Sequence, residues 1–275
     1  MRLLTAVAAT GLTLAAGAAH AASVEVKDAV ARVVVIPEAR SDIKVEMLTT
    51  NPSLPITVRT QGERTIVDGN LGRRIRSCHA EGGRVRVRVS NVGDVAYDDM
   101  PQIVIRTPKD VRVGAGGAVF GSVGKSASLD LSNAGCGDWT IANVAGKMKI
   151  NQAGSGDTNT GSSGEAILRV AGSGDVRTGP VAGPMTVEVA GSGDIDTASI
   201  AGSLDVKMAG SGDVKIAGGR ATDIVVSIAG SGDVSMGGTA QNLRARIAGS
   251  GDVRVKQVTG QVSKAIIGSG SVTIG

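Results

Sequence analysis

Seven aspartates recur along the second half of the chain, and their spacing is the strongest chemical signal in the sequence. They lie 18 to 20 residues apart and close copies of the motif Ala-Gly-Ser-Gly-Asp: Asp138, Asp157, Asp175, Asp194, Asp213, Asp233 and Asp252. Six copies are intact, the copy at 134–138 carries Cys136 in place of Ser, and a relative at 267–271 ends in Ser. Carboxylates in such an array can bind calcium or cap turns through backbone N–H groups.

The spacing favours capping over calcium. Carboxylates stacked about 4.8 Å apart repel by about 0.9 kcal/mol in water, so some interaction must offset the repulsion. The motif lacks one residue of the calcium-binding repeat Gly-Gly-x-Gly-x-Asp and occurs once per repeat rather than twice. We therefore predict that each Asp caps its own turn, with no metal site and no cofactor, and keep a calcium-stabilised scaffold as an alternative.

Other residues offer little for catalysis. Beyond the first 21 residues the one histidine is His79, so a catalytic Ser-His-Asp or Cys-His group would have to use it. Its neighbour Cys78 would point to the opposite face of a strand. The repeats are short and uniform, without long insertions that could form the walls of a cleft. We predict no catalytic residues; a polysaccharide lyase or hydrolase that uses carboxylates is the alternative.

Cys78 and Cys136 are the two cysteines of the chain. In an exported protein, oxidation of such a pair is expected. We predict a disulfide that joins the N-terminal segment to the first strong turn. The alternative is two separate small apolar residues.

The repeat predicts a single-stranded parallel β-helix, an all-β solenoid with coils of about 19 residues. Before each turn, apolar and polar residues alternate, as in Leu204, Val206 and Met208, which indicates a strand with one buried face. Stacked coils would also place opposite charges side by side in two ladders, which are Arg169, Glu188 and Lys207, and Arg177, Asp196 and Lys215.

The rest of the chain divides into two parts. Residues 1–21 have the charged start, apolar centre and Ala-x-Ala end of a signal peptide, with a membrane anchor as the weaker alternative. Residues 22–113 alternate like strands without the motif, so we predict an irregular β N-terminal cap, or alternatively a small separate β-domain. Residues 114–275 form the regular β-helix.

The mixed charge and the low aromatic content limit the kinds of partner that the protein could bind. The net charge is +4, with both signs mixed along the chain, and Phe120, Tyr97 and Trp139 are the three aromatic residues. The run Arg84, Arg86 and Arg88 is interpreted as the wet face of a strand. We predict no nucleic-acid binding and no transmembrane segment after the signal peptide.

Three segments in order carry a family resemblance. Ile66 to Leu71 contains an Asp-Gly strand end, Gln102 to Pro108 is a strand followed by Thr-Pro, and the Gly-Ser-Gly-Asp turns come next. Between about Ala31 and Asp252 the chain resembles the head GIN-domain family of auto-transporter adhesins. The resemblance implies an exported parallel β-helix and brings no catalytic residues.

We predict an exported, non-catalytic protein of the cell envelope that acts as a structural or adhesive interaction module. Its location would be the periplasm, the outer surface or the medium. The last strand, Ser271 to Ile274, is an exposed edge, and exposed edges invite partners. We therefore predict self-association through the C-terminal coil, or docking to another envelope or surface component.

Overall fold

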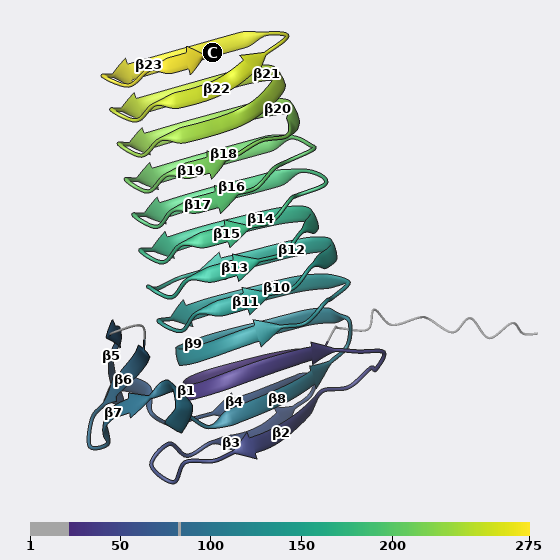
Figure 1. The fold of residues 1–275 in the computed structure, drawn as a ribbon, viewed down its shortest axis with the longest axis vertical. Coiled ribbons are helices and arrows are strands. Elements are labelled where there is room, and N and C mark those ends of the chain that lie inside the picture. The colour runs from purple at the N-terminus through teal and green to yellow at the C-terminus, as the bar shows by residue number, and fades with distance from the viewer. Residues whose placement is uncertain (1–21, 82–83) are drawn as a thin grey trace, which may run out of the picture.

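Successive repeats wind into a parallel β-solenoid, which confirms the predicted fold class. The computed structural model describes residues 22–81 and 84–275. Strands make up 68% of it, in about nine turns of about 19 residues each. Figure 1 shows the coils stacked one on another up to the last coil. The predicted signal peptide, residues 1–21, lies outside the described residues.

One face of the solenoid consists of the strands that precede the Gly-Ser-Gly-Asp corner. Each of them except the last pairs in parallel with the strand one coil later, for example Val187 with Val206. Side chains alternate between core and solvent, so that Leu204, Val206 and Met208 are buried. The strands are β10 (Ser128–Gly135), β12 (Val144–Gln152), β14 (Ser163–Gly172), β16 (Met185–Gly191), β18 (Leu204–Gly210), β20 (Arg220–Gly230), β21 (Val234–Gly249) and β23 (Val262–Gly268).

A second face follows the corner. Its strands are mostly three residues long, with the first and third side chains inward, as Ile195 and Thr197 are. They pair in parallel from coil to coil, and the start of the long strand β21 joins them through Val234. The strands are β11 (Trp139–Ile141), β13 (Thr158–Thr160), β15 (Val176–Thr178), β17 (Ile195–Thr197), β19 (Val214–Ile216), β22 (Val253–Val258) and β24 (Val272–Ile274).

The N-terminal part adds strands to the start of this stack. The long strand β1 (Ser23–Pro37) pairs in parallel with β9 (Asp110–Val123) on one side. On its other side it pairs in parallel with β4 (Arg64–Asp68) and β8 (Gln102–Thr107). Two antiparallel strands complete this end: β2 (Lys44–Thr49) lies against β8, and β3 (Thr57–Gln61) lies against β4.

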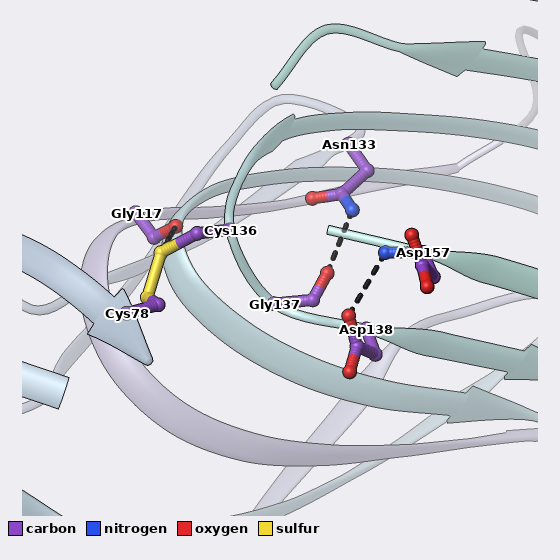
Figure 2. Close-up of a disulfide and its surroundings, with 7 residues drawn as sticks. All are labelled: Cys78, Gly117, Asn133, Cys136, Gly137, Asp138 and Asp157. Carbon is purple, nitrogen blue, oxygen red and sulfur yellow. Dashed lines mark hydrogen bonds between the residues drawn. A yellow bond between two sulfur atoms is a disulfide. The ribbon is translucent and has the colours of Figure 1, made fainter. Parts of the chain in front are cut away.

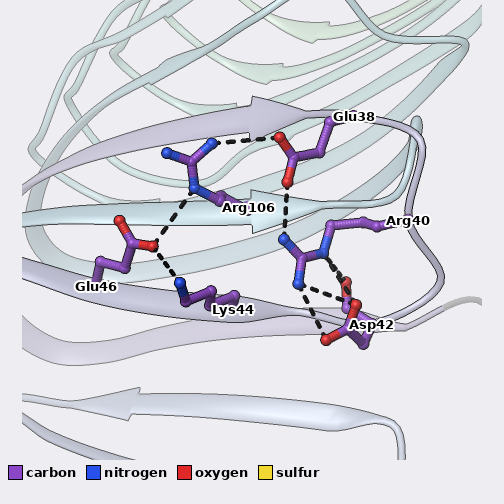
Figure 3. Close-up of polar contacts among 6 residues, drawn as sticks. All are labelled: Glu38, Arg40, Asp42, Lys44, Glu46 and Arg106. Carbon is purple, nitrogen blue, oxygen red and sulfur yellow. Dashed lines mark hydrogen bonds and ion pairs between the residues drawn. The ribbon is translucent and has the colours of Figure 1, made fainter.

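A network of ion pairs holds β2 and the β1–β2 connection against β8 (Figure 3). The Arg106 guanidinium reaches Glu38 at 3.3 Å and Glu46 at 3.5 Å, and so joins both sides of the connection. Lys44 contacts Glu46 at 2.8 Å, and Arg40 contacts Glu38 at 2.8 Å and Asp42 at 3.0 Å. Hydrogen bonds from Lys44 and Arg40 lower the pKa values of Glu46 and Asp42, which favours their ionised forms.

Three further strands form a separate antiparallel sheet beside the first coils (Figure 1). They are β5 (Ile75–Glu81), β6 (Arg84–Val89) and β7 (Gly93–Ala96), flanked by the short 3-10 helices η1 (Gly72–Arg74) and η2 (Tyr97–Asp99). We call residues 72–96 the side sheet. Its apolar face packs on β1 and β9 in a second hydrophobic cluster that includes Val30, Val87, Val89 and Phe120. The main core runs without interruption from β1 to β22.

Candidate functional site

The repeat corner is built from two glycines that lie against the coil before them. Gly210 has a φ of +148°, and a Cβ there would collide with the carbonyl oxygen of Gly191. A Cβ on Gly212 would collide with the carbonyl oxygen of Gly193. That close approach lets the Ser211 N–H donate to the Gly191 carbonyl at 3.0 Å. The motif is therefore needed to stack one corner on the next, whatever else the corner does.

The aspartates that end the motif form a continuous ladder. In each case the Oδ1 atom accepts a hydrogen bond from the backbone N–H of the equivalent residue in the next coil. The Asp157 N–H donates to Asp138 at 2.8 Å, and the series ends where the Ser271 N–H donates to Asp252 at 2.9 Å. The carboxylates thus cap the following coil, whereas the sequence led us to expect that each caps its own turn.

At two places on the ladder, arginines also reduce the repulsion between neighbouring carboxylates. Arg177 lies 3.1 Å from Asp175 and 3.9 Å from Asp157. Arg254 lies 2.6 Å from Asp252 and 3.1 Å from Asp233. Hydrogen bonds from the Ser271 side chain and backbone lower the pKa of Asp252. Together with the backbone donors, these contacts offset the repulsion between neighbouring carboxylates.

The pKa of Asp138 moves in the opposite direction at the start of the ladder. Desolvation raises it, and the hydrogen bond from the Asp157 N–H opposes that rise.

Within residues 22–81 and 84–275, no three His, Cys, Asp or Glu side chains are grouped in a way that could hold a metal ion. The ladder carboxylates accept hydrogen bonds from backbone donors along the whole series.

A groove of about 750 Å³ runs along the face just before the corner. Its floor is the first residue of the motif in six consecutive coils: Ala171, Ala190, Ala209, Ala229, Ala248 and, in the last coil, Ile267. These side chains point outward because they follow the buried strand positions by one residue. Ile267 is 80% exposed. The groove therefore presents a mainly apolar strip that crosses six coils.

A ladder of charged and polar residues borders this strip, two positions earlier in each coil: Arg169, Glu188, Lys207, Ser227 and Arg246. The predicted register is confirmed, because Glu188 pairs with Arg169 and with Lys207. Arg169 Nε lies 2.8 Å from Glu188 Oε2, and this hydrogen bond lowers the pKa of Glu188. The second predicted ladder is also confirmed, since Asp196 pairs with Arg177 and Lys215.

The predicted disulfide between Cys78 and Cys136 is confirmed, with the two Cα atoms 6.0 Å apart. Figure 2 shows that it joins β5 of the side sheet to the first corner of the solenoid. In the same corner, the Asn133 side chain donates to the Gly137 carbonyl at 2.8 Å from inside the coil. The disulfide therefore fixes the side sheet to a corner that is itself held from within.

His79 does not lie in a catalytic arrangement. It is exposed on β5 opposite Arg86, while the adjacent Cys78 is consumed in the disulfide. We did not predict the groove from the sequence, although the motif contains the pattern that produces it. Each alanine falls at an outward position of the alternating pattern, and an outward Ala in every coil gives a continuous apolar strip.

The chain resembles a protein family in sequence and a solved structure in fold. Residues 181–275 match the model of the family described as "Putative auto-transporter adhesin, head GIN domain". A solved structure from Parabacteroides distasonis ATCC 8503, described as a "Putative lipid binding protein", is 19% identical over 92% of both chains, with a TM-score of 0.54. A "putative adhesin" from Bacteroides fragilis NCTC 9343 is 15% identical over 92% of this chain and 91% of that chain, with a TM-score of 0.42.

The search of curated proteins found no match. In the described part of the chain, no helix is long and apolar enough to cross a membrane. The first of the two solved structures has the same fold over nearly its whole length. Over residues 181–275, the chain matches the head GIN-domain family of auto-transporter adhesins, which confirms the resemblance inferred from its sequence.

Proposed function

We propose that this protein is an exported, non-catalytic component of the cell envelope that acts as a structural or adhesive interaction module. The groove over the alanine ladder carries this proposal, because it is a long apolar strip bordered by charged residues. Most of it lies in residues 181–275, the part that matches an adhesin family. A neighbouring envelope component that binds there would contact several coils at once.

The predicted signal peptide and the disulfide both support export, since disulfides persist in oxidising compartments outside the cytosol. The periplasm and the outer surface both fit. We propose further that residues 22–113 act as the cap of the solenoid formed by residues 114–275. The main core continues from β22 through β9 into β1 and β8, which supports the assignment of residues 22–113 as the cap of the solenoid.

The groove can be tested with one substitution and a matched control. Ala209→Arg places a long cation in the middle of the strip, whereas Ser211→Arg places the same side chain at the tip of the same corner, outside the groove. We expect the purified protein to bind isolated envelope fractions, Ala209→Arg to weaken that binding at least tenfold, and Ser211→Arg to leave it unchanged. Equal binding by both variants would refute a role for the groove.

We also propose that the last coil mediates self-association or docking. Val262, Ile266 and Ile274 in β23 and β24 are between 36% and 44% exposed. Lys264 is exposed and stands in register with the buried Ala245, so this coil carries a charge where the preceding coil has a core residue. A charge at an edge limits indiscriminate pairing, which favours a specific partner over open-ended stacking.

Sedimentation tests this second surface. Thr273→Pro removes one backbone donor from β24 and should weaken association while the stack stays folded. Wild-type protein that sediments as a monomer at high concentration, captures no envelope component and behaves like the Pro variant would contradict the proposal.

A further inference from the structure

The side sheet concentrates positive charge. Residues 72–96 contain six arginines and two acidic residues, a net charge of +4, which equals the net charge of the whole chain. The arginines are Arg73, Arg74, Arg76, Arg84, Arg86 and Arg88. In the solenoid ladder of Arg169, Glu188 and Lys207, by contrast, the sign of the charge alternates from coil to coil. The side sheet therefore carries a local excess of positive charge.

Three of these arginines share one face of β6. Val87 and Val89 are buried against β1 and β9, so the alternating residues Arg84, Arg86 and Arg88 point to the other face. Residues two apart along a strand lie about 6.8 Å apart. His79 of β5 pairs with Arg86 and lies on the same face. The result is a nearly flat row of guanidinium groups rather than a pocket.

Arg74 and Arg76 donate hydrogen bonds to Asn70 and Ser90, outside the row on β6. Arg88 forms an ion pair with Asp94 at 3.7 Å, and its side chain is still 65% exposed. In the part of the chain that the structure describes, Arg86 forms neither an ion pair nor a side-chain hydrogen bond, and Arg84 pairs in register with Glu81 of β5. Asp98, which follows β7, faces Arg32 at 4.0 Å instead. Arg86 and the exposed side chains of Arg84 and Arg88 can therefore still donate to an external anion.

The side sheet lies where it could contact an extended surface. The second hydrophobic cluster and the disulfide to Cys136 hold it beside the first coils, where Figure 1 shows it standing apart from the stack. Arginine binds phosphate through paired N–H donors, and a flat row of arginines matches a flat layer of phosphates. The one aromatic residue near the face, Tyr97, packs edge-on against Phe120, so no base-stacking platform is present in residues 72–97.

We propose that the outward face of β5 and β6 docks the protein on a membrane surface rich in anionic phospholipid, through the row Arg84, Arg86 and Arg88. This contact is separate from the groove and does not rest on the function proposed for it. It inserts no apolar side chain, so binding is electrostatic and weakens as salt screens the charges. It would orient the solenoid relative to the membrane, with the groove left free.

Vesicle sedimentation tests the proposal. The purified protein should bind vesicles of phosphatidylcholine and phosphatidylglycerol, mixed at about 7:3, in about 20 mM salt, and bind neither pure phosphatidylcholine nor the mixture in about 500 mM salt. The triple variant Arg84→Gln, Arg86→Gln, Arg88→Gln should lose roughly a hundredfold in affinity, about fivefold for each arginine. The control Arg220→Gln, Arg244→Gln, Lys256→Gln removes the same charge from exposed solenoid positions and should lose less than about fivefold.

Four outcomes would overturn the proposal: no binding to the mixed vesicles, binding that high salt does not weaken, an equal loss in the control, or binding to soluble polyphosphate with none to vesicles. The melting temperature of each variant serves as the folding check. If the triple variant does not fold, Arg84→Gln, Arg88→Gln takes its place with an expected loss of about 25-fold. The Ala209→Arg variant should bind the vesicles as the wild type does, which separates this test from that of the groove.

Discussion

The charge ladder beside the groove allows a quantitative test of the stacking register. In the wild type, Glu188 lies between two cations, with Arg169 at 2.8 Å and Lys207 at the paired position of the following coil. The substitution Glu188→Lys removes the attraction to both and leaves three cations in consecutive coils. The buried residues of β16 are unchanged, because position 188 points outward.

The size of the effect follows from the spacing of the coils. Two unit charges about 5 Å apart interact by about 0.8 kcal/mol in water. The side chains of Arg169 and Glu188 are 44% and 37% exposed, so solvent screens them and measured exposed pairs fall between about 0.2 and 1 kcal/mol. Allowing for side chains that bend apart, we expect Glu188→Lys to lower the free energy of unfolding by about 1 kcal/mol at low salt.

Urea unfolding at about 10 mM and about 500 mM salt measures this difference, since the Debye length shrinks from about 30 Å to a few ångströms. The loss should be largest at low salt and mostly disappear at high salt. Glu188→Gln serves as the control, because it removes the ion pair without adding repulsion and should lose less. A Glu188→Lys variant as stable as the wild type at low salt would show that the ladder contributes nothing to stability.

Three further predictions concern the corner, the disulfide and the N-terminal strands. Cys78→Ser should lower the free energy of unfolding by about 2 to 4 kcal/mol, as measured by urea unfolding under oxidising conditions; an unchanged value would mean that the side sheet is held by packing alone. Gly210→Ala should destabilise by about 1 to 3 kcal/mol or more because of its φ and the clash with the preceding coil, whereas Ser211→Ala should be nearly neutral; equal melting temperatures would contradict the stacking account. The pKa of Asp68 is lowered mainly by a backbone N–H donor, so its stabilising effect is present above the ordinary Asp pKa and is lost as pH falls through the lowered value. Asp68→Asn should therefore melt below the wild type at neutral pH, with the gap closing in acid; a gap independent of pH would exclude the charge as its cause.

The solenoid could be predicted because its information is local and repeated. Alternation at Leu204, Val206 and Met208 gives the buried face, and the 19-residue period gives the partner of each residue in the next coil. Once the period is known, the pairing of Glu188 with both its neighbours follows without further assumptions. The disulfide was predicted on another ground, because Cys78 and Cys136 are the two cysteines of a chain expected to be exported.

The direction of the aspartate hydrogen bonds could not be predicted in this way. Capping of its own turn and capping of the next coil both need an Asp after two glycines, and the choice depends on how closely the corners stack. The collision that a Cβ at Gly210 would make with Gly191 shows how close they are. The side sheet was also missed, because its strands pair with one another rather than with the repeats, and no period reports on such contacts.

In a repeat protein of this kind, departures from the pattern carry more functional information than the pattern itself. The motif is explained by stacking alone, since its glycines avoid carbonyl oxygens and its aspartate accepts an N–H from the next coil. Stacking does not require Cys136 at a serine position, Ile267 at an exposed alanine position or Lys264 where the preceding coil has a core residue. Each departure lies at an end of the solenoid: the first fixes the side sheet, and the other two shape the last coil. The contacts of this protein with its surroundings should therefore be sought at the two ends and along the groove that runs from β14 to the last coil.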